Sequence, residues 1–300
     1  MARRYLPGVR AIVSAGLIIA LAGCVSGAAE PRHFGLGDLM QIEGYGSAVA
    51  DPSGRWLVYE QIRPYGTNDD YSFRTYAYEK SGHQLWRYDP ASGAAPELLP
   101  GLDPAPHSYQ QGFSPSGRFL LVMQYRFGDL SIGAYDMATD TYRRFGPVPA
   151  FSRGGEHNPV WISDEAFVYA ALADGEQPAG TSVRAHTGQV LAQAWDDAWR
   201  GAGVTANEVR TTISDVSDQQ APGRLIRANA RTGETTQLAD GLFADLRVAP
   251  GGRYLAGLSV SLPRPSRAGS LVEQDLRRYR LTVFDLASGT SRSPAPELEF

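Results

Sequence analysis

The feature that most constrains this 300-residue chain is a turn-and-strand unit that recurs along it. In each copy a turn containing Pro and Gly leads into a short run of aromatic and branched residues. Three clear copies begin at Asp51, Ser114 and Ala249, and a degenerate copy without Pro or Gly begins at Trp161. Proline presets the backbone at the start of a turn, glycine supplies positive φ, and the residues that follow favour strands. Each copy therefore predicts a strand entered through a tight turn.

A second unit is an apolar strand that ends in a polar turn. Its copies span residues 85–93, 132–140, 225–233 and 281–289, with a weaker copy at 183–188. The Asp or Asn of the turn bonds its own backbone two residues on, and the final Gly, or Asp140, takes the left-handed position. The last turn positions, 93, 140, 188, 233 and 289, are separated by 47, 48, 45 and 56 residues.

Two hairpin turns within a period of about 45 residues imply four short strands per period, which is typical of a β-propeller blade. The 33 Gly and 20 Pro spread along the chain agree with short elements joined by turns. We therefore predict an all-β propeller with about five four-stranded blades, near residues 45–100, 105–149, 155–193, 203–240 and 243–296. The sequence stops where the outer strand of the fifth blade is expected, which favours an incomplete ring and a fragment of a longer protein. A complete five-bladed ring is the alternative.

The first 24 residues are predicted to be an export signal. Arg3, Arg4 and Arg10 precede an apolar stretch, residues 11–22, that is too short to span a bilayer. The string Leu21-Ala22-Gly23-Cys24 resembles the bacterial lipobox, which implies cleavage before Cys24 and lipidation of its thiol. An ordinary signal with an incidental cysteine is the alternative. We expect residues 25–33 to be a tether, and the 34–300 propeller to be periplasmic or on the cell surface.

Two blades are expected to carry insertions. Residues 61–82 contain five aromatic residues in a polar loop, which make a candidate contact surface for a peptide: Tyr65, Tyr71, Phe73, Tyr76 and Tyr78. Packing of these aromatic side chains onto their own blade is the other interpretation. Residues 263–280 form the second insertion. Trp195 and Trp199, four residues apart, predict a short helix that buries one face.

A search for catalytic chemistry finds no constellation in the sequence. No Gly-x-Ser-x-Gly string is present, and no phosphate-binding glycine loop. The chain has one cysteine, and none of its five histidines has zinc-ligand spacing: His33, His83, His107, His157 and His186. His107 and His157 lie just ahead of predicted inner strands, where they face the central channel or cap the surface. We therefore predict no catalytic residue, metal or cofactor, and the net charge of −4 argues against a nucleic-acid partner.

The lead-in Phe34–Met40 and the first turn and strand, Asp51–Tyr59, resemble the opening of the propeller in prolyl oligopeptidase family serine peptidases. Within that family the lasso peptide isopeptidases look most similar, on the runs Tyr59–Tyr65 and Ala194–Arg200. The resemblance covers roughly residues 34–300. It implies a propeller that filters peptide substrates for a C-terminal α/β-hydrolase domain carrying a Ser-Asp-His triad. No catalytic residue carries over, because that domain is not in this sequence.

Two functions remain open at this point. The first is the substrate-gating propeller of an exported serine peptidase or isopeptidase that acts on peptides, with lasso peptides as one substrate class. Its partners are then a peptide, the hydrolase domain and, through the lipid anchor only, a membrane. The second is a stand-alone periplasmic propeller that serves as a binding scaffold.

Overall fold

The computed structural model describes residues 33–67, 82–126, 129–150, 158–174, 193–202, 223–261, 278–295 and 298–299. The chain divides into two units, residues 1–39 and 40–300. The described part of the first unit contains helix α2 (Leu36–Leu39), where the Asp38 carboxylate accepts the backbone N–H of Gly35 at 2.8 Å. No described helix has both the length and the apolar character needed to cross a membrane.

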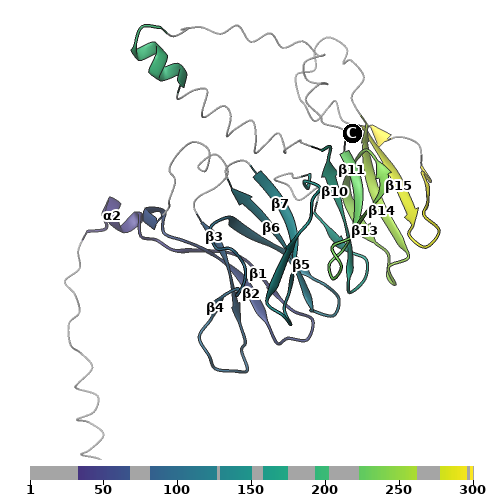
Figure 1. Cartoon of the computed structure of the whole chain (residues 1–300), viewed down its shortest axis with the longest axis horizontal. Coiled ribbons are helices and arrows are strands. Elements are labelled where there is room, and N and C mark those ends of the chain that lie inside the picture. Colours follow the sequence, from purple (N-terminus) through teal and green to yellow (C-terminus); the bar gives the residue numbers. More distant parts are fainter. Residues whose placement is uncertain are drawn as a thin grey trace, which may run out of the picture. The chain divides into compact units, whose positions relative to one another are not determined.

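The described part of the second unit contains four antiparallel sheets, which we number 1 to 4 along the chain (Figure 1). Sheet 1 holds β1 (Gly44–Ala50), β2 (Leu57–Ile62), β3 (His83–Tyr88) and β4 (Glu97–Leu98), with the 3-10 helix η1 (Tyr65–Thr67) after β2. Sheet 2 holds β5 (His107–Phe113), β6 (Phe119–Arg126), β7 (Asp129–Asp136) and β8 (Thr141–Arg144). Sheet 3 holds β9 (Val160–Trp161), β10 (Ala166–Leu172), β11 (Gly223–Asn229) and β12 (Thr235–Asp240). Sheet 4 holds β13 (Leu242–Val248), β14 (Tyr254–Ser261), β15 (Arg278–Asp285) and β16 (Thr290–Arg292), and β17 (Leu298–Glu299) also pairs with β15.

This architecture confirms the predicted fold class: four-stranded blades, each built from consecutive strands, contact one another in chain order. Among the described elements, sheet 1 contacts sheet 2, sheets 2 and 3 share an apolar cluster, and sheet 3 contacts sheet 4. No comparable contact joins sheet 4 to sheet 1, so the described blades form an open row and not a closed ring.

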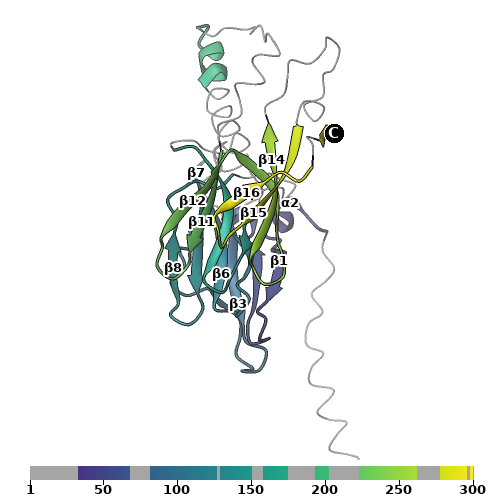
Figure 2. The same ribbon diagram turned by 90° about the vertical axis from the view of Figure 1, so that its right-hand side faces the viewer.

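The boundary between the third and fourth expected blades differs from the prediction. The strands expected near 155–193 and 203–240 belong to one sheet, because β10 pairs with β11 from Ala166–Asn229 to Leu172–Gly223 (Figure 1). On its other side β11 pairs with β12 (Figure 2). The described residues therefore form four blades and not five. The weak turn copy at 183–188, which suggested a separate blade, lies between these two strands and outside the described residues.

The core lies between successive sheets. Alternate side chains of a strand point to opposite faces, so a strand covered on both faces is buried along its length. In β6, Leu120 and Val122 pack toward sheet 1 with Val58, while Leu121 and Met123 join the cluster shared with sheet 3. Sheets 3 and 4 meet through a third cluster of apolar side chains: Val168, Leu225, Phe243, Leu246, Leu255 and Phe284.

The repeated turns are fixed by their own side chains, which the sequence predicted for the Asp of the second unit. Asp51 Oδ1 accepts the backbone N–H of Trp56 at 2.7 Å, and Ser114 Oγ accepts that of Phe119 at 3.1 Å. Asp136 and Asp285 each accept the backbone N–H two residues on, at 2.9 and 3.0 Å. These bonds satisfy backbone N–H groups of the turns that have no partner in a neighbouring strand.

Candidate functional site

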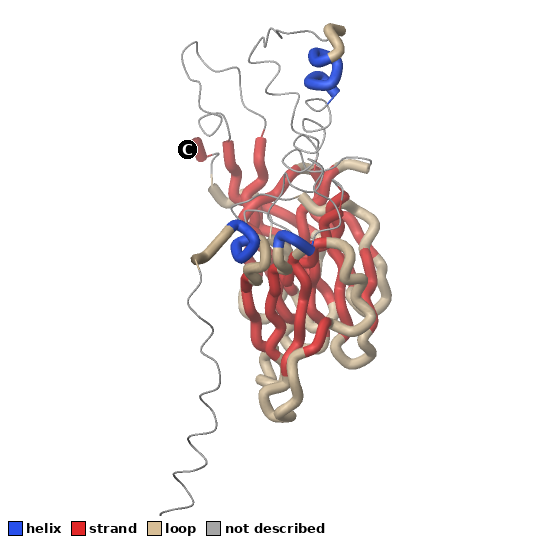
Figure 3. Tube along the Cα trace, turned by 90° about the vertical axis from the view of Figure 1, so that its left-hand side faces the viewer, coloured by secondary structure: helices blue, strands red, loops and turns tan. Residues whose placement is uncertain are grey.

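Three of the sheets have a long connection between the second and third strands, and these connections start at the same edge of each sheet. In each sheet the end of the second strand pairs with the start of the third, at Ile62–His83, Leu172–Gly223 and Ser261–Arg278. The chain between these ends spans residues 63–82, 173–222 and 262–277, whereas β6 and β7 of sheet 2 are joined directly after Arg126–Asp129. We call this the insertion edge; the opposite edge carries the short repeated turns (Figure 3).

A buried polar cluster lies at the base of the first insertion, between sheets 1 and 2. Glu60 of β2 accepts the Ser47 hydroxyl at 2.8 Å and the backbone N–H of Gln110 at 3.1 Å through Oε1. Its Oε2 lies 3.3 Å from the backbone N–H of Ser47 and 3.5 Å from His83 Nδ1. The Gln110 amide donates to Ser47 Oγ at 2.9 Å. The three strands β1, β2 and β5 are thus joined through one carboxylate.

A bulge in β1 makes this arrangement possible. Tyr45 pairs with Gln61 and Ala48 with Tyr59, so Gly46 and Ser47 together oppose Glu60. The extra residue turns the Ser47 backbone N–H and hydroxyl toward the carboxylate. A Cβ on Gly46 would overlap Glu60 Oε2, so glycine is needed there for the carboxylate to fit.

Glu60 is 6% exposed and is held in its charged form. Burial opposes ionisation, but the interactions with His83 and Ser47 outweigh it and keep the pKa of Glu60 below its usual value. The buried charge is compensated by donors from two neighbouring strands, which is the condition under which such a group is tolerated.

His107 joins the end of the insertion to sheet 2. Its Nδ1 accepts the backbone N–H of Gly82 at 2.9 Å, which requires the neutral imidazole. Burial, with the His83 and Arg63 side chains nearby, lowers the pKa of His107 from 6.5 to about 4. The backbone N–H of Arg63 donates to Gly82 O at 3.2 Å, so the two ends of the insertion also meet each other.

The hydrogen bonds of this cluster join neighbouring strands, and they do not arrange a catalytic nucleophile. The Ser47 hydroxyl donates to Glu60, whose lowered pKa makes it a weak base, and it also accepts the Gln110 side-chain amide, so both hydrogen bonds hold it as a structural contact. Among the described residues, no group of three His, Cys, Asp or Glu side chains is placed to hold a metal ion.

Only some of the predicted site residues lie within the described part of the chain. Tyr65 lies in η1 and is half-buried, next to Gly66, whose backbone N–H donates to Met40 O at 2.9 Å. His33 is exposed, whereas His83 and His107 are buried. The remaining candidates lie outside the described residues: Cys24, Tyr71, Phe73, Tyr76, Tyr78, His157 and His186.

Trp195 and Trp199 are not buried as their spacing predicted. Residues 193–199 are helical, but Trp195 is 75% exposed and Trp199 91% exposed, so the predicted buried face is not buried by the described residues. The spacing of Trp195 and Trp199 places them on one face of the helix, and that face is exposed.

Sequence reasoning did not select Glu60. One signal for it was present: β2 alternates, and the side chains that face sheet 2 are Val58 and Glu60, so a charge occupies a position in phase with the core. At the corresponding position sheet 2 has Met123, which packs in the apolar cluster with sheet 3.

No protein-family model matches the chain, and no curated protein matches it. Among solved structures, a putative TolB from Agrobacterium tumefaciens is similar, with a TM-score of 0.40 and 12% identity over 83% of this chain and 64% of that one. An acylaminoacyl peptidase from Pyrococcus horikoshii gives 0.46 and 8%, over 87% and 34%. The AtxE2 isopeptidase gives 0.35 and 11%, over 87% and 39%.

These neighbours are thus a TolB protein and two peptidases, and this chain spans between about a third and two thirds of their lengths. At these identities and TM-scores the similarities carry no argument about what the chain does. The fold assignment rests on the sheet order and registers given above.

Proposed function

We propose that the chain is the substrate-gating propeller of an exported serine peptidase of the prolyl oligopeptidase type, acting on peptides. The observation that carries this proposal is the insertion edge. Three of the four sheets extend the same connection, between the second and third strands, while the turns of the opposite edge stay short. Long connections on a rigid scaffold are where binding residues gather. The resemblance of Phe34–Met40 and Asp51–Tyr59 to the family's first blade supplies the reaction class.

Within this proposal the first insertion contacts the peptide. Its aromatic residues Tyr71, Phe73, Tyr76 and Tyr78 supply apolar contact area with polar edges. Both ends of the insertion are held, by Arg63 and Gly82 to each other and by His107 to sheet 2. A loop fixed at its base loses less conformational entropy when a peptide binds to it. Lasso peptides are the substrate class that the resemblance favours, and Cys24 is the proposed site of lipidation.

The first test is the coding sequence downstream of Phe300. A continuing frame with Gly-x-Ser-x-Gly, followed by Asp and His, supports a peptidase. A stop codon directly after Phe300 contradicts it and favours the stand-alone binding scaffold instead.

The second test is biochemical and uses the whole gene product. A fluorophosphonate probe is expected to label it, and replacing Tyr71 and Tyr76 by Ser is expected to raise KM for peptides without changing the labelling. Tyr254→Ser, on an exposed aromatic of the short-turn edge, is the matched control. Equal KM values in both variants would contradict peptide contact by the insertion. Labelling of the Cys24→Ala variant with a fatty-acid probe would contradict lipidation at that thiol.

A further inference from the structure

Arg63, the first residue after β2, carries a guanidinium that has no partner among the described residues. Its Nε is buried without a hydrogen bond, and no carboxylate of these residues pairs with it. The side chain as a whole is half-buried, so part of it is open to solvent. Other arginines pair with an Asp or a Glu: Arg87, Arg118, Arg144, Arg200, Arg224, Arg231 and Arg253. Because a guanidinium stays charged, Arg63 holds a partly desolvated charge that these residues do not compensate.

The backbone around Arg63 fixes where the guanidinium lies. The Arg63 N–H donates to Gly82 O at 3.2 Å, and the Gly82 N–H donates to His107 Nδ1 at 2.9 Å. A Cβ on Gly82 would overlap Arg63 Nε, so the guanidinium lies directly against the Cα of this glycine. After burial and His83, Arg63 is the third cause of the lowered pKa of His107, so its charge lies near that imidazole. Because the cation is already positioned, a ligand that binds it has little of the protein left to order.

The same strand end in sheet 2 differs at one position. By strand register Arg63 corresponds to Arg126, and Gly82, the next residue on the opposing strand, corresponds to Asp129. The Asp129 carboxylate accepts the Arg144 guanidinium at 3.1 Å, so in sheet 2 the opposing strand brings a carboxylate to this edge. Sheet 1 has glycine at that position. It therefore keeps the arginine of the strand end without the carboxylate on the strand opposite.

The buried carboxylate of the same strand is already bound by other groups. Glu60 Oε1 accepts the Ser47 hydroxyl at 2.8 Å and the backbone N–H of Gln110 at 3.1 Å. Its Oε2 lies 3.5 Å from His83 Nδ1. Arg63 is thus left with one positive charge for a ligand to balance. A guanidinium binds a carboxylate through two parallel N–H···O bonds, whereas a phosphate group carries about −1.5 to −2 and would stay partly uncompensated.

We propose that Arg63 is the residue of the insertion edge that binds the carboxylate of a peptide, through its guanidinium. The carboxylate is that of the peptide's C-terminus or of an Asp or Glu side chain, since both present the same two oxygens. The choice of a peptide rests on the proposed function, in which the insertion edge contacts the substrate; the need for an anion rests on Arg63 alone. A neutral analogue leaves the charged donor unpaired, so such a site discriminates strongly against it. The propeller is therefore expected to bind acidic peptides in preference to their amides.

The first test measures peptide binding by the purified chain, with isothermal titration calorimetry. Three probes are compared: an acetylated pentapeptide of Ala and Phe with a free C-terminal carboxylate, its C-terminal amide, and the amide with one internal Asp. At least one of the two carboxylate peptides is expected to bind about 10-fold or more tightly than the plain amide, and the one that does so identifies the source of the carboxylate. Equal affinities for all three would overturn this inference and leave the proposed function intact, whereas binding of none of them would contradict both.

The second test removes the guanidinium. Arg63→Gln is expected to abolish the preference, so that the carboxylate peptide and the amide bind within about 2-fold of each other. Its urea-unfolding midpoint is expected to stay unchanged or rise, because the guanidinium bonds no other described group. Arg55→Gln is the matched control, since Arg55 is exposed at the opposite edge, 4.8 Å from the Trp56 ring centre, and is expected to keep the preference. A preference that survives in Arg63→Gln, or that is lost equally in Arg55→Gln, would overturn the assignment.

A reversal of charge tests the contact without relying on a loss. Arg63→Glu is expected to bind a C-terminal amide with one internal Lys about 10-fold more tightly than the carboxylate peptide, because the charge that faces the ligand is reversed. Arg63→Lys keeps a positive charge but not the forked donor, so it is expected to retain a weaker preference for the carboxylate. If Arg63→Glu still prefers the carboxylate peptide, the preference arises elsewhere on the chain and the proposal is wrong.

Discussion

The imidazole Nδ1 of His107 accepts the backbone N–H of Gly82 at 2.9 Å, across the boundary between the first two blades. His107 is 8% exposed, and Gly82 has a φ of 54°, which a glycine adopts without strain. This bond joins the last residue of an insertion to the first residue of the neighbouring inner strand. Because only a neutral imidazole accepts in this way, the contact couples the insertion to pH.

The first prediction concerns that coupling. The pKa of His107 is about 4 in the folded chain and near 6.5 when unfolded, so the unfolded chain takes up the proton first as pH falls. The free energy of unfolding should therefore decrease from above pH 6.5 down to about pH 4, by up to about 3 kcal/mol from this residue. His107→Asn keeps an acceptor but binds no proton, so its unfolding free energy should depend less on pH between 7.5 and 4.5, as measured with denaturant. The matched control is His33→Asn, on an exposed histidine; an unchanged slope in His107→Asn would refute the coupling.

The second prediction concerns the buried carboxylate. Glu60→Gln replaces one acceptor oxygen by a donor, in a site where Ser47 and Gln110 present only donors to it. The expected loss of unfolding free energy is about 2 to 4 kcal/mol, because a charge-assisted network is broken and a buried donor is left unpaired. Glu43→Gln is the control, since the exposed Glu43 carboxylate also accepts a side-chain hydrogen bond, from Gln61 at 2.9 Å. Similar losses in the two variants, measured by urea unfolding, would show that Glu60 is not a special position.

The sequence predicted four-stranded blades correctly, but it divided the described residues into five blades where they form four. Turn chemistry is local, so Asp51, Ser114 and Asp136 indicated their hairpins directly. The pairing of β10 with β11 is not local: it crosses residues 173–222, and long loops add little entropic cost to a pairing. A prediction based on the spacing of turns alone therefore assigned the strands of one blade to two blades.

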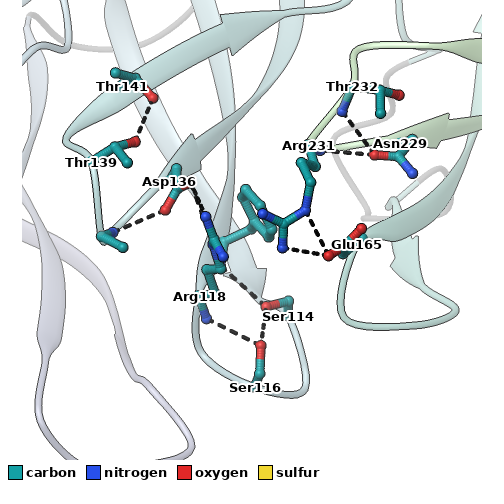
Figure 4. A network of polar contacts seen from close by, with 12 residues as sticks. Ser114, Ser116, Arg118, Asp136, Thr139, Thr141, Glu165, Asn229, Arg231 and Thr232 are labelled. Atoms are coloured by element: carbon teal, nitrogen blue, oxygen red, sulfur yellow. Dashed lines mark hydrogen bonds and ion pairs between the residues drawn. The ribbon is translucent and has the colours of Figure 1, made fainter.

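The degenerate turn copy shows why the polar contacts were harder to predict. In sheet 2 the turn residue Arg118 pairs with Asp136 at 3.0 Å, and in sheet 4 Arg253 pairs with Asp285 at 2.9 Å. Sheet 3 reverses the charges: Glu165 lies in the first turn and Arg231 in the second, with Nε to Oε1 at 2.7 Å (Figure 4). A search for Pro-x-Gly-Arg turns finds the first two pairs and misses the third. Glu60 was missed for a related reason, because its donors come from a bulge and from another blade.

The third prediction concerns the ion pair at the opposite edge of sheets 1 and 2. Arg87 is 8% exposed and bonds Glu97 at 2.8 Å and both oxygens of Asp140, the nearer at 2.5 Å. Its guanidinium also lies 4.7 Å from the Trp56 ring centre. Arg87→Lys should lower the unfolding free energy by about 2 kcal/mol, because an ammonium replaces neither the forked contact nor the stacking. The control is Arg144→Lys, whose pair with Asp129 is half exposed on both sides and should change by less than about 0.5 kcal/mol.

The last prediction concerns two adjacent glycines in the turn between β13 and β14. Gly251 has a φ of 85° and Gly252 a φ of 73°, so alanine at either position takes on similar backbone strain, about 1 kcal/mol. Their surroundings differ. A Cβ on Gly251 meets nothing within 4 Å, whereas a Cβ on Gly252 would overlap the carbonyl oxygen of Ile162 in sheet 3. Gly252→Ala should therefore cost about 1 to 3 kcal/mol more than Gly251→Ala, because a backbone carbonyl between two blades yields less than a side chain does. Thermal unfolding of the two variants under the same conditions measures the difference, and equal losses would mean that sheets 3 and 4 do not meet at this turn.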